Sequence, residues 1–146
     1  MKRFLRCLSL VLVLVMALGT VTSAQEISPR SSYFFASWDS SLYKTGSDQF
    51  QIWFDVVAMG GMDELGVSTI EVQRSSNTTS WTTVRTYHSA YYSAMIEEDT
   101  SAVCNYVTYT GTTGYYYRAY VTFYAKDYTG TGEMYDYSEV LYLPRT

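Results

Sequence analysis

Few side chains in this sequence are of the types that carry out catalysis. His88 is its one histidine, so a Ser–His–acid triad would have to use it as the base. The Gly-x-Ser-x-Gly motif that presents the nucleophile in many hydrolases is absent. Zinc sites usually draw on several His and Cys ligands, and this chain has one histidine and two cysteines. We therefore expect no enzymatic activity, no catalytic residue, no metal site and no cofactor.

A glycine-rich segment, residues 60–66, reads Gly-Gly-Met-Asp-Glu-Leu-Gly and holds two carboxylates that could bind calcium. An EF-hand loop needs oxygen ligands at alternating positions and a closing glutamate, and that pattern is absent here. Glycines at this density are typical of a loop with positive φ angles or close backbone packing. We interpret residues 60–66 as a solvated loop between two strands and leave ion binding there open.

Tyrosine is the third group of interest, with 16 residues among 146. In a strand over 115–125, alternate side chains would point away from the core. The outward residues that could bind a ligand are Tyr116, Arg118, Tyr120 and Tyr124. Aromatic stripes on flat sheets stack on sugar rings or anchor protein interfaces. Because tyrosine also has a high strand propensity, the stripe could instead simply cover a half-exposed sheet.

Alternation of apolar and polar residues predicts the elements that position this stripe. The clearest case is 50–56, where four apolar residues alternate with Gln51, Trp53 and Asp55. The predicted strands cover 33–43, 50–56, 67–74, 81–87, 103–109, 115–125 and 137–143. Residues 88–100 read as a long connection and 127–133 as a glycine-rich hairpin. About seven strands without an amphipathic helix predict an all-β, antiparallel sandwich.

Several of these segments resemble the fibronectin type III superfamily of immunoglobulin-like sandwiches. The residues that carry the resemblance are 70–75 with 81–84, then 114–121, Gly130, Gly132 and 137–140. They cover roughly the last half of the chain. The resemblance implies an immunoglobulin-like or fibronectin type III-like sandwich. It also implies that Tyr115 lies near a corner where its hydroxyl can bond back to the backbone. Independently of the resemblance, if the strand over 115–125 is central, Glu71 would lie across from Arg118 on a neighbouring strand.

The chain as a whole also resembles a family of small secreted proteins from Gram-positive bacteria, a domain of unknown function. The residues that carry this likeness are the segment 61–66 and the late strand 114–117. The resemblance implies a secreted bacterial domain and supplies no catalytic residue.

The first 24 residues have the order of a secretory signal peptide. Lys2, Arg3 and Arg6 precede an apolar run over 8–18, and small residues follow at 22–24. We expect a signal peptide at 1–24, a flexible lead-in at 25–32 and the β-sandwich domain at 33–146. Cleavage would remove three of the 10 basic residues and none of the 14 acidic ones, for a net charge of about −7. This charge argues against a nucleic-acid partner, and no second apolar segment predicts a membrane span after cleavage.

Cys104 would be the one cysteine left after cleavage, so an intrachain disulfide is excluded. We favour a small buried side chain at this position over an intermolecular disulfide, because no cationic pocket is evident to activate the thiol.

The sequence thus predicts a secreted, non-enzymatic recognition or adhesion module, outside the cell or on its surface. Its partner would be an extracellular protein, bound through the tyrosine stripe. The alternative is a carbohydrate-binding module, which requires the stripe to be exposed and coplanar. A small hydrolase is a third possibility and requires His88 or a pair of carboxylates to line a pocket.

Overall fold

Seven antiparallel strands make up most of the chain in the computed structural model, which describes residues 31–145. A one-turn helix, α2 (Ser31–Phe34), and a short 3₁₀ helix, η1 (Ser93–Met95), accompany them. The strands are β1 (Phe35–Lys44), β2 (Gln49–Ser75), β3 (Thr82–His88), β4 (Ile96–Thr110), β5 (Tyr115–Asp127), β6 (Gly130–Tyr137) and β7 (Leu141–Leu143). The predicted signal peptide and most of the predicted lead-in lie outside the described residues.

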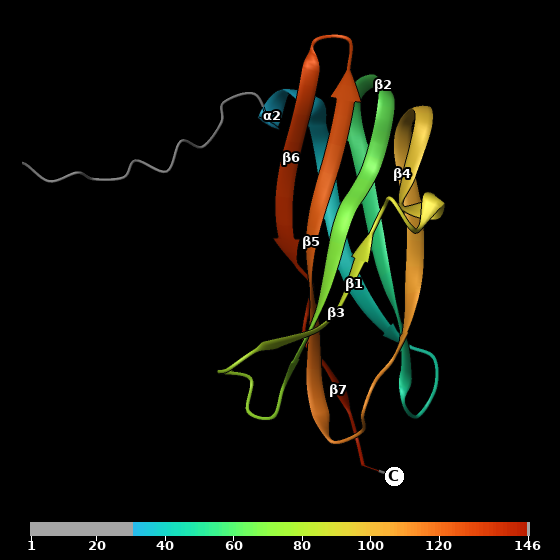
Figure 1. The fold of residues 1–146 in the computed structure, drawn as a ribbon. Helices are drawn as coiled ribbons and strands as arrows, with labels where there is room; N and C mark the ends of the chain where they lie inside the picture. The colour runs from blue at the N-terminus through green and yellow to red at the C-terminus, as the bar shows by residue number, and fades with distance from the viewer. Residues whose placement is uncertain (1–30, 146) are drawn as a thin grey trace, which may run out of the picture.

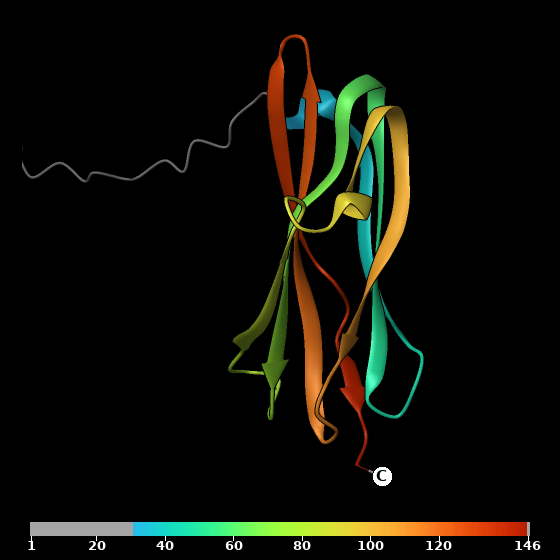
Figure 2. The ribbon, with the colours of Figure 1, turned by 45° about the vertical axis from the view of Figure 1, so that its right-hand side comes forward.

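Two long strands, β2 and β4, each take part in two layers. Figure 1 shows β2 rising, turning over at the top and descending, and β4 does the same beside it. The rising half of β2 pairs with β1 and the descending part of β4, whereas its second half pairs with β3, β5 and the first residues of β4. Figure 2 shows the two layers facing each other. The all-β sandwich predicted from the sequence is therefore confirmed, with all strands joined into one hydrogen-bonded sheet.

The predicted loop at 60–66 is not a loop, because these residues belong to β2. The pairing with β4 shifts register between Val57 and Met62, and a bend of this kind lets a strand pass from one layer to the other. Gly66 lies beyond the bend with φ +150°, and a Cβ there would be 2.9 Å from Cα of Ile96 and would collide with the carbonyl oxygen of Met95. Gly66 thus lets the η1–β4 junction approach the second half of β2.

The core between the layers follows the predicted alternation. Phe50, Ile52, Phe54 and Val56 are buried on the first half of β2. On β5, Tyr117, Ala119, Val121 and Phe123 are all fully buried, as expected for one face of a strand. Tyr117 packs against Phe50 with their ring centroids 5.2 Å apart.

The tyrosine that bonds back to the backbone is Tyr117 and not Tyr115 as predicted. The Tyr117 hydroxyl accepts a hydrogen bond from the backbone N–H of Thr112 at 2.7 Å and donates one to the carbonyl of the same residue at 3.1 Å. Gly111 closes over the ring, since a Cβ there would be 2.9 Å from the ring carbon Cζ. Both tyrosines are on the inward face of β5, and Tyr117 is the fully buried one.

Several predicted boundaries also change. Tyr33 lies in α2 instead of the first strand, and residues 96–100 of the predicted connection are the first part of β4. The hairpin turn is shorter than predicted, because β6 already begins at Gly130. The last strand is divided into β6 and β7. Between them, the buried Ser138 accepts a hydrogen bond from the backbone N–H of Ala119 through its Oγ at 2.8 Å.

The interpretation of Cys104 as a buried residue is wrong. Cys104 is exposed on β4, on the outer face of the layer that also contains Trp53. It lies directly opposite Asp55 in the β2–β4 register. Partial desolvation and the Asp55 carboxylate raise the pKa of the thiol, so it is largely protonated at neutral pH.

Candidate functional site

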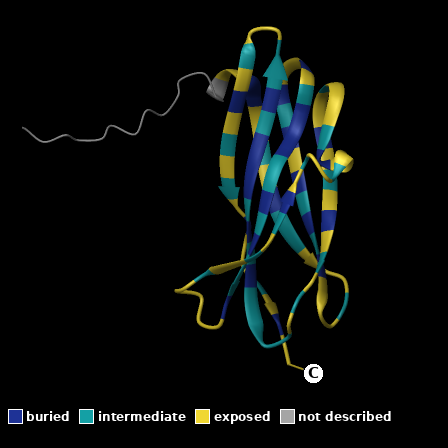
Figure 3. Ribbon diagram, in the orientation of Figure 1, coloured by how far each residue is buried: buried dark blue, intermediate teal, exposed yellow. Residues whose placement is uncertain are grey.

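The four candidate ligand-binding residues lie on the outward face of β5. Figure 3 shows the buried and half-buried residues alternating along this strand. The outward side chains of Tyr116, Arg118, Tyr120 and Tyr124 are all half-buried. The exposure of Tyr116, Arg118 and Tyr120 is limited because aromatic side chains of β6 and β7 and the Trp81 side chain lie beside them.

The more exposed tyrosines of this face come from β6 and β7 and were not among the predicted residues. Tyr135, Tyr137 and Tyr142 are 54%, 51% and 44% exposed. Tyr135 and Tyr137 lie two residues apart and share the spacing of Glu133, which places all three on one face of a strand, and this period of two was a signal that could have identified them. We call the residues Trp81, Tyr116, Arg118, Tyr120, Tyr135, Tyr137 and Tyr142 the tyrosine face.

Strand register brings the rings of the tyrosine face together. Tyr120 pairs with Tyr137 across β5 and β6, and their ring centroids are 4.6 Å apart. The ring of Tyr120 also stacks on Tyr135, at 5.9 Å and an interplanar angle of 7°. At the other end of β5, Tyr116 pairs with Tyr142 of β7 at 4.7 Å. Such cross-strand aromatic pairs contribute about 0.2–1 kcal/mol each, so the face is held in one arrangement.

Arg118 lies in the middle of this face, between two aromatic rings. Its guanidinium carbon is 4.4 Å from the ring centroid of Trp81 and 4.3 Å from that of Tyr137. Its Nε donates a hydrogen bond to Oε1 of Gln73 at 2.8 Å. The residue opposite Arg118 on β2 is thus Gln73, and the expectation that Glu71 would lie there is wrong. Glu71 instead pairs with Tyr120 and accepts a hydrogen bond from Thr83 at 3.1 Å.

Tyr124 is separated from the other three candidates by its surroundings. Beside it, Lys126 and Glu64 form an ion pair across β5 and β2. Burial raises the pKa of the Tyr124 hydroxyl, and the Glu64 carboxylate raises it further. Burial also raises the pKa of Tyr120, while a hydrogen bond to Glu133 raises that of Tyr135. These hydroxyls are therefore neutral hydrogen-bonding groups at physiological pH.

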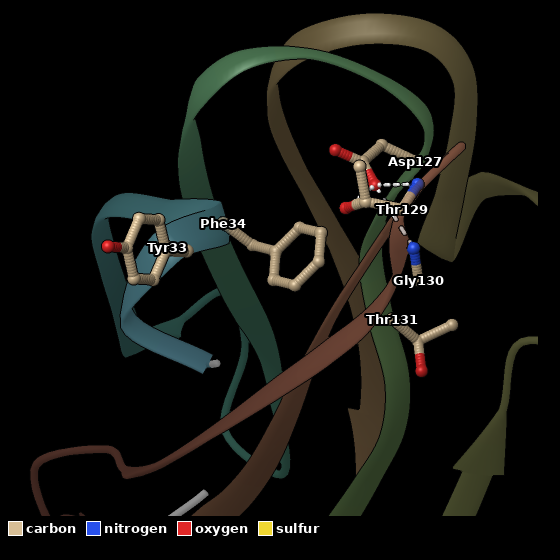
Figure 4. Close-up of a pocket in the computed structure, with 6 residues that line it drawn as sticks. All are labelled: Tyr33, Phe34, Asp127, Thr129, Gly130 and Thr131. Atoms are coloured by element: carbon tan, nitrogen blue, oxygen red, sulfur yellow. Dashed lines mark hydrogen bonds between the residues drawn. The ribbon is translucent and has the colours of Figure 1, made fainter. Parts of the chain in front are cut away.

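A pocket of about 470 Å³ lies between α2 and the β5–β6 turn, as Figure 4 shows. Its lining residues are Tyr33, Phe34, Asp127, Thr129, Gly130 and Thr131. The Asp127 carboxylate already accepts hydrogen bonds from the backbone N–H groups of Thr129 and Gly130 and from the Thr129 hydroxyl. These bonds lower the pKa of Asp127 and hold the turn. Among its described lining residues, the pocket thus presents one carboxylate, whose role is structural, and no histidine or cysteine.

His88 is exposed at the end of β3, next to Tyr91 at a ring distance of 6.4 Å. Within residues 31–145, no three His, Cys, Asp or Glu side chains are grouped so that they could hold a metal ion. No helix of this part of the chain is long and apolar enough to cross a membrane.

Comparison with known proteins gives no relative from which a function could be transferred. No family model, no curated protein and no solved structure matches the chain. Inferences about function therefore depend on the geometry of the tyrosine face.

Proposed function

We propose that this protein is a secreted, non-enzymatic recognition module that binds a protein partner through its tyrosine face. The observation that carries the proposal is the position of Arg118 between Trp81 and Tyr137. Tyr, Trp and Arg are the residues that contribute most to binding at protein interfaces. Here Trp81, Arg118, Tyr137, Tyr120 and Tyr135 form a continuous series of contacting side chains, so little side-chain entropy would be lost on binding.

The fold supports a module of the immunoglobulin-like or fibronectin type III-like kind. In such sandwiches a tyrosine near the start of the sixth strand bonds back to the backbone a few residues upstream. Tyr117 makes this contact with Thr112, five residues earlier. The rising half of β2 has β1 and β4 as neighbours, and its second half has β3 and β5. If the two halves of β2 are counted separately, β5 is the sixth strand.

A protein partner is favoured over a glycan by the arrangement of the rings. A sugar-binding platform needs exposed ring faces in one plane. One face of Tyr120 is covered by Tyr135, and the Tyr120 and Tyr137 rings are inclined by 36°. The Tyr116 and Tyr142 rings are inclined by the same angle. This uneven surface suits the side chains of a protein interface better than the flat face of a sugar ring.

The proposal is tested by selecting binders for the purified protein from a displayed random-peptide library and, in parallel, probing a glycan array. We expect peptide binders whose affinity falls at least tenfold in Tyr137→Ser. Tyr43→Ser is the matched control, because Tyr43 is 59% exposed but lies on β1 in the other layer. Peptide binders that tolerate Tyr137→Ser would contradict the proposal. Selective glycan binding that Tyr120→Ala abolishes would instead identify a carbohydrate-binding module.

A further inference from the structure

We infer that Arg118 is the anchor for a carboxylate group of the protein partner. The inference rests on the proposed function of the tyrosine face and adds the chemistry that the partner must present. The carboxylate would be an Asp or Glu side chain or a free C-terminus, because both present the same planar pair of oxygens.

The contacts of Arg118 fix its position and leave its terminal amino groups without a hydrogen-bond partner among the described residues. The guanidinium carbon lies 4.4 Å from the ring centroid of Trp81 and 4.3 Å from that of Tyr137, and Gln73 accepts the hydrogen bond from Nε. Within residues 31–145, the two terminal amino groups make no hydrogen bond and no ion pair. A guanidinium held in this way presents a rigid pair of donors that matches the two oxygens of a carboxylate.

In the part of the chain that the structure describes, no carboxylate forms an ion pair with Arg118. Glu71, on the neighbouring strand, lies opposite Tyr120 and accepts a hydrogen bond from Thr83. Arg118 is thus a cation without a carboxylate partner in a chain that has four more acidic than basic residues. An acidic group on a partner would supply the missing charge.

A singly charged carboxylate fits this site better than a phosphate. Phosphate-binding sites usually combine several cations or a run of backbone N–H groups. The other outward-facing cation of β5 is Lys126, and it is paired with Glu64. One unpaired guanidinium flanked by aromatic rings therefore points to a carboxylate next to apolar or aromatic groups.

The test uses a synthetic decapeptide library of random sequence, prepared with free C-terminal carboxylates and again as C-terminal amides. We expect the peptides that bind the protein to be enriched in Asp and Glu, or to bind only with a free C-terminus. Replacing the acid by its amide should weaken binding at least tenfold, since hydrogen bonds to charged groups are the strong ones. Comparison of the two libraries separates a side-chain carboxylate from a terminal one.

Three variants separate a specific contact from general electrostatics and from misfolding. Arg118→Gln should lose at least tenfold in affinity for the acidic peptides and lose the preference for acid over amide. Arg118→Lys keeps the charge without the planar pair of donors and should lose most of the affinity as well. Lys44→Gln removes one positive charge from the exposed end of β1 in the other layer and should stay within about twofold of the original affinity. Circular dichroism and urea unfolding establish that each variant is folded.

The possible outcomes separate this inference from the proposed function. Peptides that bind Arg118→Gln as well as the original protein but fail to bind Tyr137→Ser would overturn the carboxylate anchor and leave the tyrosine face as a recognition surface. Selected peptides without acidic residues would also overturn it. Arg118-dependent binding of uronic-acid glycans, without any peptide binder, would show that the acidic partner is a carbohydrate and would overturn a protein partner.

Discussion

Removal of the Tyr117 hydroxyl tests whether the turn between β4 and β5 is fixed by a single side chain. Tyr117 is fully buried, and its hydroxyl both accepts from the N–H and donates to the carbonyl of Thr112. In Tyr117→Phe the ring and its packing against Phe50 remain, so the change removes two hydrogen bonds with almost no loss of packing. The two backbone groups of Thr112 then lose their partner.

The expected cost follows from these two hydrogen bonds. Each contributes about 0.5–1.5 kcal/mol net, so their loss should lower the free energy of unfolding by about 1–3 kcal/mol. For a domain of this size, a loss of 1 kcal/mol corresponds to a fall in Tm of about 4 °C. We therefore expect Tm to fall by about 4–12 °C, with an unchanged slope of unfolding free energy against urea concentration, since the surface exposed on unfolding is the same.

The measurement is urea unfolding followed by tryptophan fluorescence. Tyr128→Phe is the matched control, because it removes the same atom from a tyrosine that is 94% exposed, and we expect it to stay within about 0.5 kcal/mol of the original protein. Equal stability of Tyr117→Phe and Tyr128→Phe would show that water replaces both hydrogen bonds and that the corner does not depend on the hydroxyl.

Three further changes test other parts of the fold. Gly66→Ala would force a methyl group against the carbonyl of Met95, and we expect a loss of about 1–3 kcal/mol or more in urea unfolding. A fully stable Gly66→Ala variant would show that the junction of η1 and β4 can move away. Ser138→Ala leaves the backbone N–H of Ala119 without its partner and should cost about 1–3 kcal/mol, whereas Ser138→Thr retains the hydroxyl as a control. The depressed pKa of Asp127 contributes stability above the pKa of the unfolded chain, near pH 4, and this contribution is lost as pH falls through the folded pKa. Asp127→Asn should therefore weaken the fall in Tm below about pH 4, and an unchanged pH profile would contradict the assigned hydrogen bonds.

Alternation of polarity was sufficient to predict the sandwich because most strands have one buried and one exposed face. The run from Phe50 to Val56 follows this rule residue by residue, and so does most of β5, where the buried Thr122 on the outward face is an exception. The rule fails at 60–66, since a strand that passes from one layer to the other does not keep one face toward the core. The glycine content of this segment is typical of a loop, but here the segment forms a bend in β2 and Gly66 allows a close approach of the backbone.

Of the candidate site, the sequence predicted only the residues that lie on β5. The period of two placed Arg118 and the tyrosines of β5 on one outward face, and the structure has them there. Their neighbours depend on register, which is set by turn lengths and bulges that a single sequence does not reveal. This is why Gln73, and not Glu71, lies opposite Arg118, and why the contribution of Trp81 was missed.

Aromatic residues alone do not distinguish the tyrosine face from the outer face of the other layer. There, Trp53 lies 4.8 Å from Tyr106 and 6.4 Å from Tyr43, measured between ring centroids. The charged residues on that face near Trp53 are Asp39 and Asp55, which face each other across β1 and β2. Strand propensity is enough to account for aromatic rings on both layers. Strand propensity does not account for a guanidinium that contacts two aromatic rings and has no carboxylate partner in the described part of the chain. For this reason the functional proposal depends on Arg118.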